Sequence, residues 1–251
     1  MLVVGIPTLN EADNIADLTA KIDAAAQELG IDIFIINADS SSEDFTSKMF
    51  LETGTRCKKI SIINKEDGKG RNIYSIIKEA VSLDNIEGLM LIDGDITSFS
   101  TNWLSSFYQS LKKNNDYIIP VYARNFQEGN ATNHFFYPLL YAHTNGNAPR
   151  QPIAGDFGLS HKMLDFLMSK AVWHKFCFEY GIDIFLTLQA LYNSLKVSEV
   201  KLEAKCHKPS FDKMIKIFSG EATSYYETSA QLFNSNKRKV FLSDFDIIAD
   251  E

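Results

Sequence analysis

The sequence is poor in cysteine. Three of its 251 residues are cysteines, and no two of them stand in a C-x-x-C pair. An odd, widely spaced set of thiols is not typical of a disulfide-built extracellular domain or of a zinc finger. Long apolar runs are also missing, because stretches such as residues 135–142 fall far short of the roughly 20 residues of a membrane helix. The N-terminus carries no basic leader, so we expect a cytoplasmic protein without a transmembrane segment.

Basic residues are in the minority as well. The 25 Lys and Arg stand against 32 Asp and Glu, which gives a net charge of −7. Proteins that bind nucleic acid through their overall charge show a basic surplus, so this class is excluded as a first hypothesis. An acidic protein that handles a polyanion does so locally, most simply through a divalent metal ion. The 45% of hydrophobic residues are enough for a sizeable core in one large domain or two small ones.

Strand-like and helix-like patterns alternate along the first half of the chain. Apolar residues at spacings of three and four predict helices, such as the one that carries Ile15, Leu18 and Ile22 and ends at Gly30. Asn10 and Ser42 are the expected N-caps of the first two helices. Short apolar runs predict strands over residues 2–6, 31–36, 59–64, 89–92 and 117–121. This rhythm is typical of βαβ units, so we predict an α/β fold with a mostly parallel sheet flanked by helices.

The second half is less regular. It predicts helices over residues 135–142, 181–192 and 211–233, a loop over 151–160 and a strand over 196–205. Residues 237–239 form a short basic segment that we interpret as a solvated turn. The chain shows no repeat and no low-complexity linker, so we expect one continuous domain.

Polar residues and glycines follow the predicted strands. Ligands of parallel sheets bind at the carboxyl ends of the strands, so these segments are expected to share one edge. Asp93-Gly94-Asp95 stands out because two carboxylates one residue apart suit a hard divalent cation, which can hold a diphosphate. The alternative is an ordinary acidic turn.

Gly68-Lys69-Gly70 precedes a predicted helix and could bind an anion through its backbone N–H groups. It is not a Walker A loop, and the first strand is not followed by a dinucleotide-binding G-x-G-x-x-G, which counts against an NAD enzyme. The alternative is a flexible solvent loop. His207 follows the strand over 196–205 and could be either a metal ligand or an ordinary surface histidine. Asp183 could either face a substrate or serve only as a helix N-terminal charge.

With these residues in place, the chain resembles a nucleotide-sugar glycosyltransferase of the GT-A fold, in the style of family 2. The similarity rests on residues 6–11, 39–46, 68–70 and the DxD motif at 93–95, in the family's order. The second half is more loosely similar to the retaining glucosyl-3-phosphoglycerate and mannosylglycerate synthases, through residues 151–157, 180–184 and His207.

The resemblance implies a role for each matching residue. It implies a nucleotide-sugar-binding half over residues 1–121, and an acceptor-binding half with a helical tail over 122–251. It implies Mg²⁺ or Mn²⁺ held by Asp93, Asp95 and His207, with Lys69 and Asp183 as catalytic residues. The implied donor-binding residues are Pro7, Leu9, Glu11, Asp39, Ser40, Lys69, Asp93 and Gly94. The implied acceptor-binding residues are Thr132, Ala154, Gly155 and Asp156.

Two departures from the family pattern affect the expected substrate. Ala38 replaces one aspartate of a family doublet, and Asn130 stands where the phosphoglycerate enzymes have an arginine. Without that arginine a phosphate loses its strongest partner, so an unphosphorylated acceptor such as glycerate fits better, unless Arg124 or Arg150 substitutes. We therefore expect metal-dependent sugar transfer from a nucleoside-diphosphate sugar to a small polar acceptor, with retention of configuration, by a possible homodimer.

Two alternatives stay open. An inverting family 2 enzyme that acts on a surface glycan or a lipid phosphate would use the same strand-end loops. It would need Asp183 or Asp156 as a general base. A non-enzymatic, nucleotide-sugar-binding relative would have little need for Asp93, Asp95 and His207 together.

Overall fold

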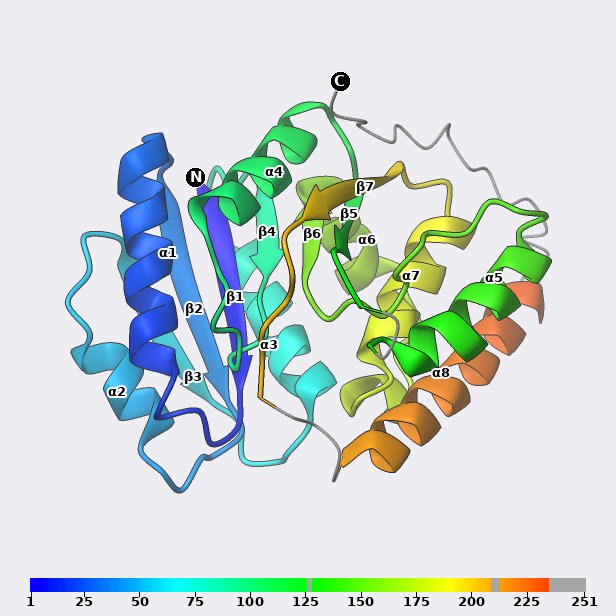
Figure 1. Cartoon of the computed structure of the whole chain (residues 1–251), viewed down its shortest axis with the longest axis horizontal. Helices are drawn as coiled ribbons and strands as arrows, with labels where there is room; N and C mark the ends of the chain where they lie inside the picture. The colour runs from blue at the N-terminus through cyan, green and yellow to red at the C-terminus, as the bar shows by residue number, and fades with distance from the viewer. Residues whose placement is uncertain (126–127, 209–212, 235–251) are drawn as a thin grey trace.

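Seven strands form a single sheet in the computed structural model, which describes residues 1–125, 128–208 and 213–234 (Figure 1). The strands lie in the order β3-β2-β1-β4-β6-β5-β7. β1 is in the interior and pairs in parallel with both β2 and β4. The bounds are β1 Leu2–Thr8, β2 Ile33–Asp39, β3 Lys58–Ile63, β4 Gly88–Leu91, β5 Tyr117–Tyr122, β6 Phe157–Ser160 and β7 Val197–Leu202. The predicted α/β class with a mostly parallel sheet is confirmed.

β6 corrects the prediction of a loop over residues 151–160. It runs antiparallel between β4 and β5, with Leu91 opposite Phe157. Its four residues are too short to show an alternating pattern, and Gly158 allows the side chains of Phe107 and Ile118 to approach closely. Because β6 is antiparallel, its first residue lies at the edge where the parallel strands end. Asp156, directly before it, is thereby brought to that edge.

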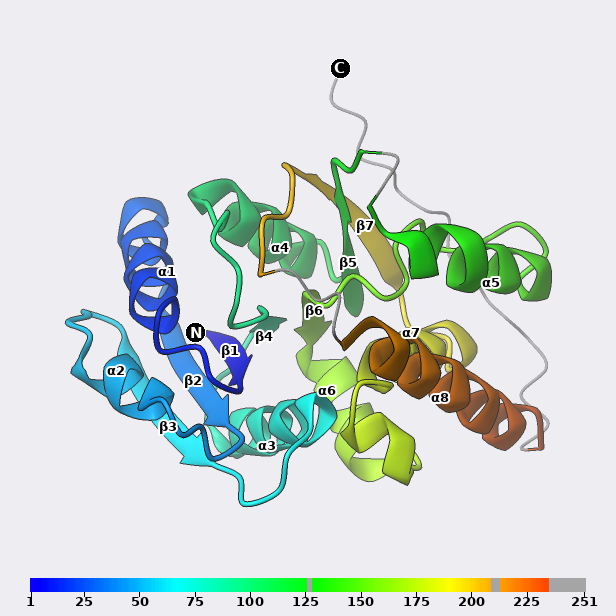
Figure 2. The ribbon, with the colours of Figure 1, turned by 60° about the horizontal axis from the view of Figure 1, so that its bottom comes forward.

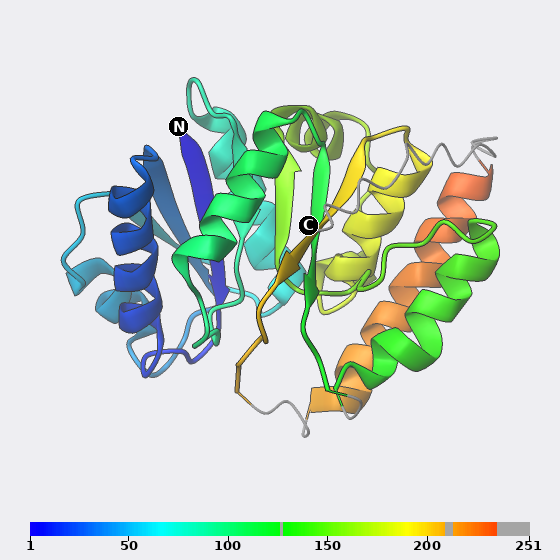
Figure 3. The same cartoon turned by 45° about the horizontal axis from the view of Figure 1, so that its top comes forward.

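Helices cover both faces of the sheet. α1 and α4 pack together on one face, and α3 packs with α6 and α7 on the other (Figure 3). α5 and α8 lie side by side at the end of the molecule away from α2, where Phe135 and Phe218 are in ring contact at 5.0 Å (Figures 1 and 3). The first four helices are α1 Ile15–Leu29, α2 Thr46–Glu52, α3 Lys69–Ser82 and α4 Thr101–Lys112. The later ones are the π-helix η1 Thr132–Phe136, α5 Tyr137–His143, α6 His161–Ser169, the 3₁₀ helix η2 Lys175–Phe178, α7 Ile182–Tyr192 and α8 Met214–Asn234.

The apolar periodicity of the sequence matches the core. The predicted stripe of α1 is buried, and the helix ends at Gly30, whose φ of 64° is favoured in glycine. α7 differs because all eleven of its residues are buried, so it lies inside the molecule between the sheet and α8. No helix in the described ranges combines the length and apolar character needed to cross a bilayer.

The two predicted helix caps are wrong. α1 begins at Ile15 and α2 at Thr46, each several residues after the predicted cap. Asn10 and Ser42 instead hold two loops together, since the Asn10 backbone N–H donates to Ser42 Oγ at 2.7 Å. The Asn10 side-chain oxygen in turn accepts from the backbone of Glu43 at 3.1 Å. The basic segment 237–239 lies outside the described residues.

Candidate functional site

A cluster of two lysines and three carboxylates occupies the edge where the parallel strands end, which Figure 2 brings forward. We call it the two-lysine cluster. Its members come from five different segments of the chain, and they are Lys69, Asp93, Asp156, Asp183 and Lys205. Lys69 opens α3, and its Nζ lies 2.9 Å from Asp93 Oδ1 and 3.1 Å from Asp183 Oδ1. The structure therefore joins the two predicted catalytic residues directly.

Lys205 is the second cation of the cluster. It follows β7, and its Nζ lies 3.0 Å from Asp93 Oδ2 and 2.7 Å from Asp156 Oδ2. It also donates to the carbonyl oxygen of Ala154 at 3.0 Å. One side chain thus ties the DxD motif to the segment before β6.

Asp156 is completely buried and fully engaged. Besides Lys205, it accepts a hydrogen bond from the Asp93 backbone N–H at 2.8 Å and one from the Tyr122 hydroxyl at 2.6 Å. Buried carboxylates need such partners, because an unpaired charge in the interior costs several kcal/mol. Asp156 therefore anchors the cluster and has no free face for a substrate.

The ionisation of the cluster follows from its composition. Burial by itself raises the pKa of Asp93, but the ammonium groups of Lys69 and Lys205 outweigh it and hold that pKa well below its usual range. Burial also works against both lysines, and the surrounding carboxylates overcome it and raise the lysine pKa values. Burial, together with the charge of Asp93, raises the pKa of Asp183 against the pull of Lys69. The two lysines thus favour the ionised form of Asp93.

Asp95 and His207 form a separate rim beside this cluster. Their closest side-chain atoms, Asp95 Oδ2 and His207 Nδ1, are 3.8 Å apart. Burial and the negative charge of Asp93 raise the pKa of Asp95. The imidazole Nδ1 lies 2.8 Å from the backbone carbonyl of Lys208. The rim thus has a carboxylate in a negative environment and one imidazole.

A divalent cation fits this donor set in chemical terms. Carboxylate oxygens and an imidazole are suitable ligands for Mn²⁺ and Mg²⁺, and a cation would relieve the repulsion between Asp93 and Asp95. Within the described ranges, no group of three or more His, Cys, Asp or Glu side chains converges on one metal position. Asp93 is turned toward the two lysines. A complete metal site here therefore needs oxygen ligands from outside the protein, such as those of a diphosphate.

Two predicted glycines lie tightly against the DxD segment. Gly155 has a φ of +91°, and a Cβ there would collide with Asp93 Oδ2. A Cβ at Gly94 would lie 2.6 Å from Thr8 Cγ2. Both positions allow backbone to approach the site closely, so any larger residue would displace the carboxylate or the end of β1.

Asp39 at the end of β2 has its carboxylate turned into its own loop. It accepts from Thr8 Oγ1 at 3.0 Å, from the Ser42 backbone at 2.9 Å and from Ser42 Oγ at 2.5 Å. Ser40 is also buried. Glu11, after β1, is paired with Lys208 at 2.7 Å. These predicted donor residues lie at the same sheet edge as the cluster, but the carboxylates of Asp39 and Glu11 are already paired with protein groups.

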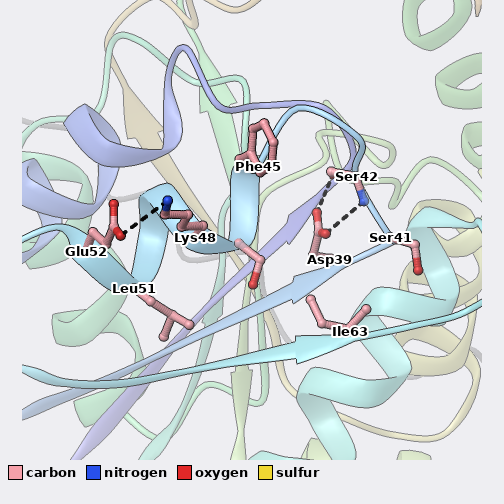
Figure 4. A pocket seen from close by; sticks show the side chains of 9 residues that line it. Asp39, Ser41, Ser42, Phe45, Lys48, Leu51, Glu52 and Ile63 are labelled. Carbon is pink, nitrogen blue, oxygen red and sulfur yellow. Dashed lines mark hydrogen bonds and ion pairs between the residues drawn. The ribbon is translucent and has the colours of Figure 1, made fainter.

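A pocket of about 570 Å³ opens beside Asp39, between α2 and the end of β3 (Figure 4). Lys69, Asp93, Asp95 and His207 are not among the residues that line it. Its wall mixes exposed apolar side chains with an ion pair from α2, and the lining residues are Asp39, Ser41, Ser42, Phe45, Ser47, Lys48, Leu51, Glu52 and Ile63. The pocket therefore shares only Asp39 with the predicted donor set.

The remaining predicted residues are less closely connected to the cluster. Pro7 is buried within β1, and Leu9 is partly exposed just after it. Thr132 is buried in η1, and no hydrogen bond between described residues ties its side chain to the two-lysine cluster. The structure thus brings the catalytic, DxD and residue 154–156 predictions together, and leaves Thr132 apart.

The sequence analysis missed Lys205 and Tyr122. Both lie at strand ends, like the residues that were found, since Tyr122 is the last residue of β5 and Lys205 follows β7. The same strand-end argument, applied to the second half, would have indicated them.

The comparison with protein families agrees with this arrangement. The model of glycosyl transferase family 2 matches residues 3–167, which is more than half of the chain. The chain belongs to glycosyltransferase family 2. A comparison with curated protein sequences found no match. The enzyme class that the family resemblance implied is therefore confirmed.

Solved structures of this fold extend the similarity over nearly the whole glycosyltransferase. Glucosyl-3-phosphoglycerate synthase from Mycobacterium tuberculosis, in complex with Mn²⁺, UDP and phosphoglyceric acid, has a TM-score of 0.74 at 19% identity, over 91% of this chain and 78% of that one. The same enzyme with Mg²⁺ and UDP has a TM-score of 0.72 at 18% identity, over 92% and 79% of the two chains. At this identity the likeness establishes the GT-A fold.

Proposed function

We propose that this glycosyltransferase moves a sugar from a nucleoside-diphosphate sugar to a small polar acceptor such as glycerate, with a divalent metal ion as cofactor. The observation that carries the proposal is the rim of Asp95 and His207 beside the two-lysine cluster, at the ligand-binding edge of the sheet. Each carboxylate of the cluster is paired with at least one lysine, whereas Asp95 at the rim has no lysine partner among the described residues and could bind a metal cation.

Asp95 and His207, with Asp93 alongside, would hold Mg²⁺ or Mn²⁺. The bound ion supplies charge stabilisation to the leaving diphosphate. Lys69 lies at the start of α3, where its ammonium group and the helix N-terminus both favour an anion. Pro7, Leu9 and Glu11 would frame the nucleoside, with Asp39, Ser40 and Gly94 beside it. In this arrangement the negative charge of the donor's diphosphate would be balanced by the bound metal ion, by Lys69 and by the N-terminus of α3.

The geometry narrows the choice of a general base. Asp156 is buried and bonded to Lys205, Tyr122 and the Asp93 backbone, so it is not free to take a proton from an acceptor. Asp183 is 7% exposed, and among the described residues Lys69 is its one lysine partner. We assign Asp183 the role of orienting an acceptor or sugar hydroxyl. In a retaining reaction the departing diphosphate can accept the proton, so no stronger base is required.

The acceptor side carries a cation that the sequence motif lacks. Asn130 occupies the arginine position of the phosphoglycerate enzymes, but Arg124 lies against Gly129, the residue before it. Arg124 can therefore supply a charged donor close to the segment that carries Thr132. This favours an anionic acceptor, with Ala154 and Gly155 contributing backbone groups near Asp93. The structural neighbour binds phosphoglyceric acid, which supports a small acid of this kind.

The test is a donor and acceptor screen on the purified full chain. We expect a UDP-, GDP- or ADP-sugar to raise the melting temperature of the protein. The increase should be larger in Mn²⁺ than in EDTA. The stabilising donor is then incubated with glycerate and 3-phosphoglycerate, and the anomeric configuration of the product is determined by NMR. Transfer that is unchanged in EDTA contradicts the metal cofactor. A product of inverted configuration contradicts retention and indicates the inverting alternative.

A further inference from the structure

The C-terminal helix contributes two buried polar side chains to the first turn of α7, beside the site. Glu221 and Ser224 lie one turn apart on the same face of α8, and they are 1% and 0% exposed. A glutamate with this burial is unusual, because charged side chains are almost never fully buried without a charged partner. No lysine or arginine in the described part of the chain forms an ion pair with it.

Both side chains hold the turn that carries Asp183. Glu221 Oε2 accepts a hydrogen bond from the Ile184 backbone N–H at 3.1 Å, and Ser224 Oγ donates to the Gly181 carbonyl at 2.6 Å. The N–H of Ile184 is one of the first in α7, where no residue of the helix itself can accept from it. Gly181 is packed so closely against α8 that a Cβ there would collide with the Ser224 side chain. The turn is therefore held by α8 at two positions, the Ile184 N–H and the Gly181 carbonyl.

Burial and the neighbouring charged groups shift the pKa of Glu221. Burial, together with the negative charge of Asp183, raises the pKa of Glu221 well above its ordinary value, against the pull of Lys69 and of the backbone N–H groups. The charged groups that act on it are thus Asp183 on α7 and Lys69 on α3. A protonated Glu221 still accepts from Ile184, and it adds no second negative charge beside Asp183. Lys69 is then left to pair with Asp183 and Asp93.

We propose that Glu221 and Ser224 are positioning residues, which set the direction of the Asp183 carboxylate by holding the first turn of α7. The inference rests on the proposed function, since it deepens the role given there to Asp183. It makes α8, which lies outside the sheet and outside the family match at residues 3–167, a part of the catalytic architecture.

The test compares Glu221→Leu, Glu221→Gln and Ser224→Ala with a matched control. The control is Thr228→Val, because Thr228 is also a fully buried polar residue of α8, but it bonds to His174 at 2.9 Å instead of the α7 turn. We expect Glu221→Leu to lower kcat by about 10- to 100-fold, as misplacement of a reacting group does, with the donor KM within about 2-fold of wild type. Ser224→Ala should lower kcat by a smaller factor. Glu221→Gln keeps the acceptor oxygen and should restore kcat to within about 3-fold of wild type.

Two results would overturn the inference. One is a kcat for Glu221→Leu that matches that of Thr228→Val, and the other is a kcat for Glu221→Gln that falls as far as that of Glu221→Leu. Amide hydrogen exchange at residues 182–185 gives a readout that does not require activity. We expect exchange there to be faster in Glu221→Leu and unchanged in Thr228→Val. An inactive wild type would contradict the proposed function, and the exchange data would still decide the positioning role.

Discussion

The two-lysine cluster and the Asp95–His207 rim lie side by side, yet their charges are balanced in opposite ways. In the cluster, Asp93 is held between two ammonium groups, and its pKa is lowered. Two residues further along the same loop, Asp95 has an imidazole 3.8 Å away, and its pKa is raised by burial and by Asp93. One half of the DxD motif is neutralised by the protein, and the other half is left for a ligand.

The difference explains how an acidic protein could accommodate the anionic donor that we propose. If both Asp93 and Asp95 were paired with lysines, neither carboxylate would be left to attract a metal ion. If neither were paired, the buried carboxylates would repel each other and the loop would be unstable. The lysines of the cluster hold the DxD loop in place through Asp93, while Asp95 at the rim can still pair with a cation.

The largest expected effect comes from removing Lys205, because the cluster then loses the cation between Asp93 and Asp156. We expect Lys205→Met to lower the free energy of unfolding by about 3–5 kcal/mol, as for other broken buried ion pairs, and to abolish transfer. Urea titration and a transfer assay measure the two effects. Lys208→Met is the matched control, since Lys208 also pairs with two carboxylates but at the surface, and should cost less than about 1 kcal/mol. If the two variants lost the same free energy of unfolding, Lys205 would not hold the cluster together as proposed.

A smaller effect on folding and a large effect on metal binding are expected from Asp95→Asn. The substitution removes the charge that the rim reserves for a cation, so we expect Mn²⁺ affinity to fall by about 100-fold in the presence of the donor nucleotide. Isothermal titration with Mn²⁺ and UDP measures it, and a His207→Ala variant should show a weaker loss. If Asp95→Asn bound Mn²⁺ as tightly as the wild type does, the rim would not be a metal site, and the DxD segment would be an ordinary acidic turn.

The smallest effect is on the pH dependence of stability in EDTA, and its sign differs between the two carboxylates. A raised pKa means that ionised Asp95 weakens the fold, so Asp95→Asn should be more stable than wild type at pH 7, with the difference vanishing below about pH 3.8. A lowered pKa means that ionised Asp93 stabilises the fold. Asp93→Asn should therefore be less stable than wild type at pH 7, and this difference shrinks as the pH falls below 3.8.

Urea titrations at a series of pH values distinguish the two. The same sign for both variants at pH 7 would contradict the opposite balance of the two regions.

The sequence was most informative where the chain follows the regular βα rhythm. Lys69, Asp93 and Asp95 were found because each follows a strand or opens a helix in the parallel half, where local pattern and position at the sheet edge coincide. β6 was missed because four residues cannot establish a period. Lys205 was missed although it ends the predicted strand over residues 196–205, because the second half lacks the regular βα rhythm that marks the strand ends of the first.

Three assignments of the sequence analysis remain predictions. The division into donor and acceptor halves at residue 121, the homodimer and the individual site roles are not tested by the fold. A single sheet draws strands from both sides of residue 121, because β6 lies between β4 and β5. The halves are therefore joined in one structure, whatever each of them binds.

The sequence by itself determined the class of fold and the position of Lys69, Asp93 and Asp95 at one edge of the sheet. These depend on local periodicity and on residues that stand directly after strands, and both are properties of short segments. Only the tertiary structure decided which carboxylate receives a cation from the protein. Lys69, Lys205 and Asp156 reach Asp93 across separations of 24 to 112 residues. Charge balance in a buried site depends on distances of a few ångströms between such segments, and the order of residues along the chain does not give these distances.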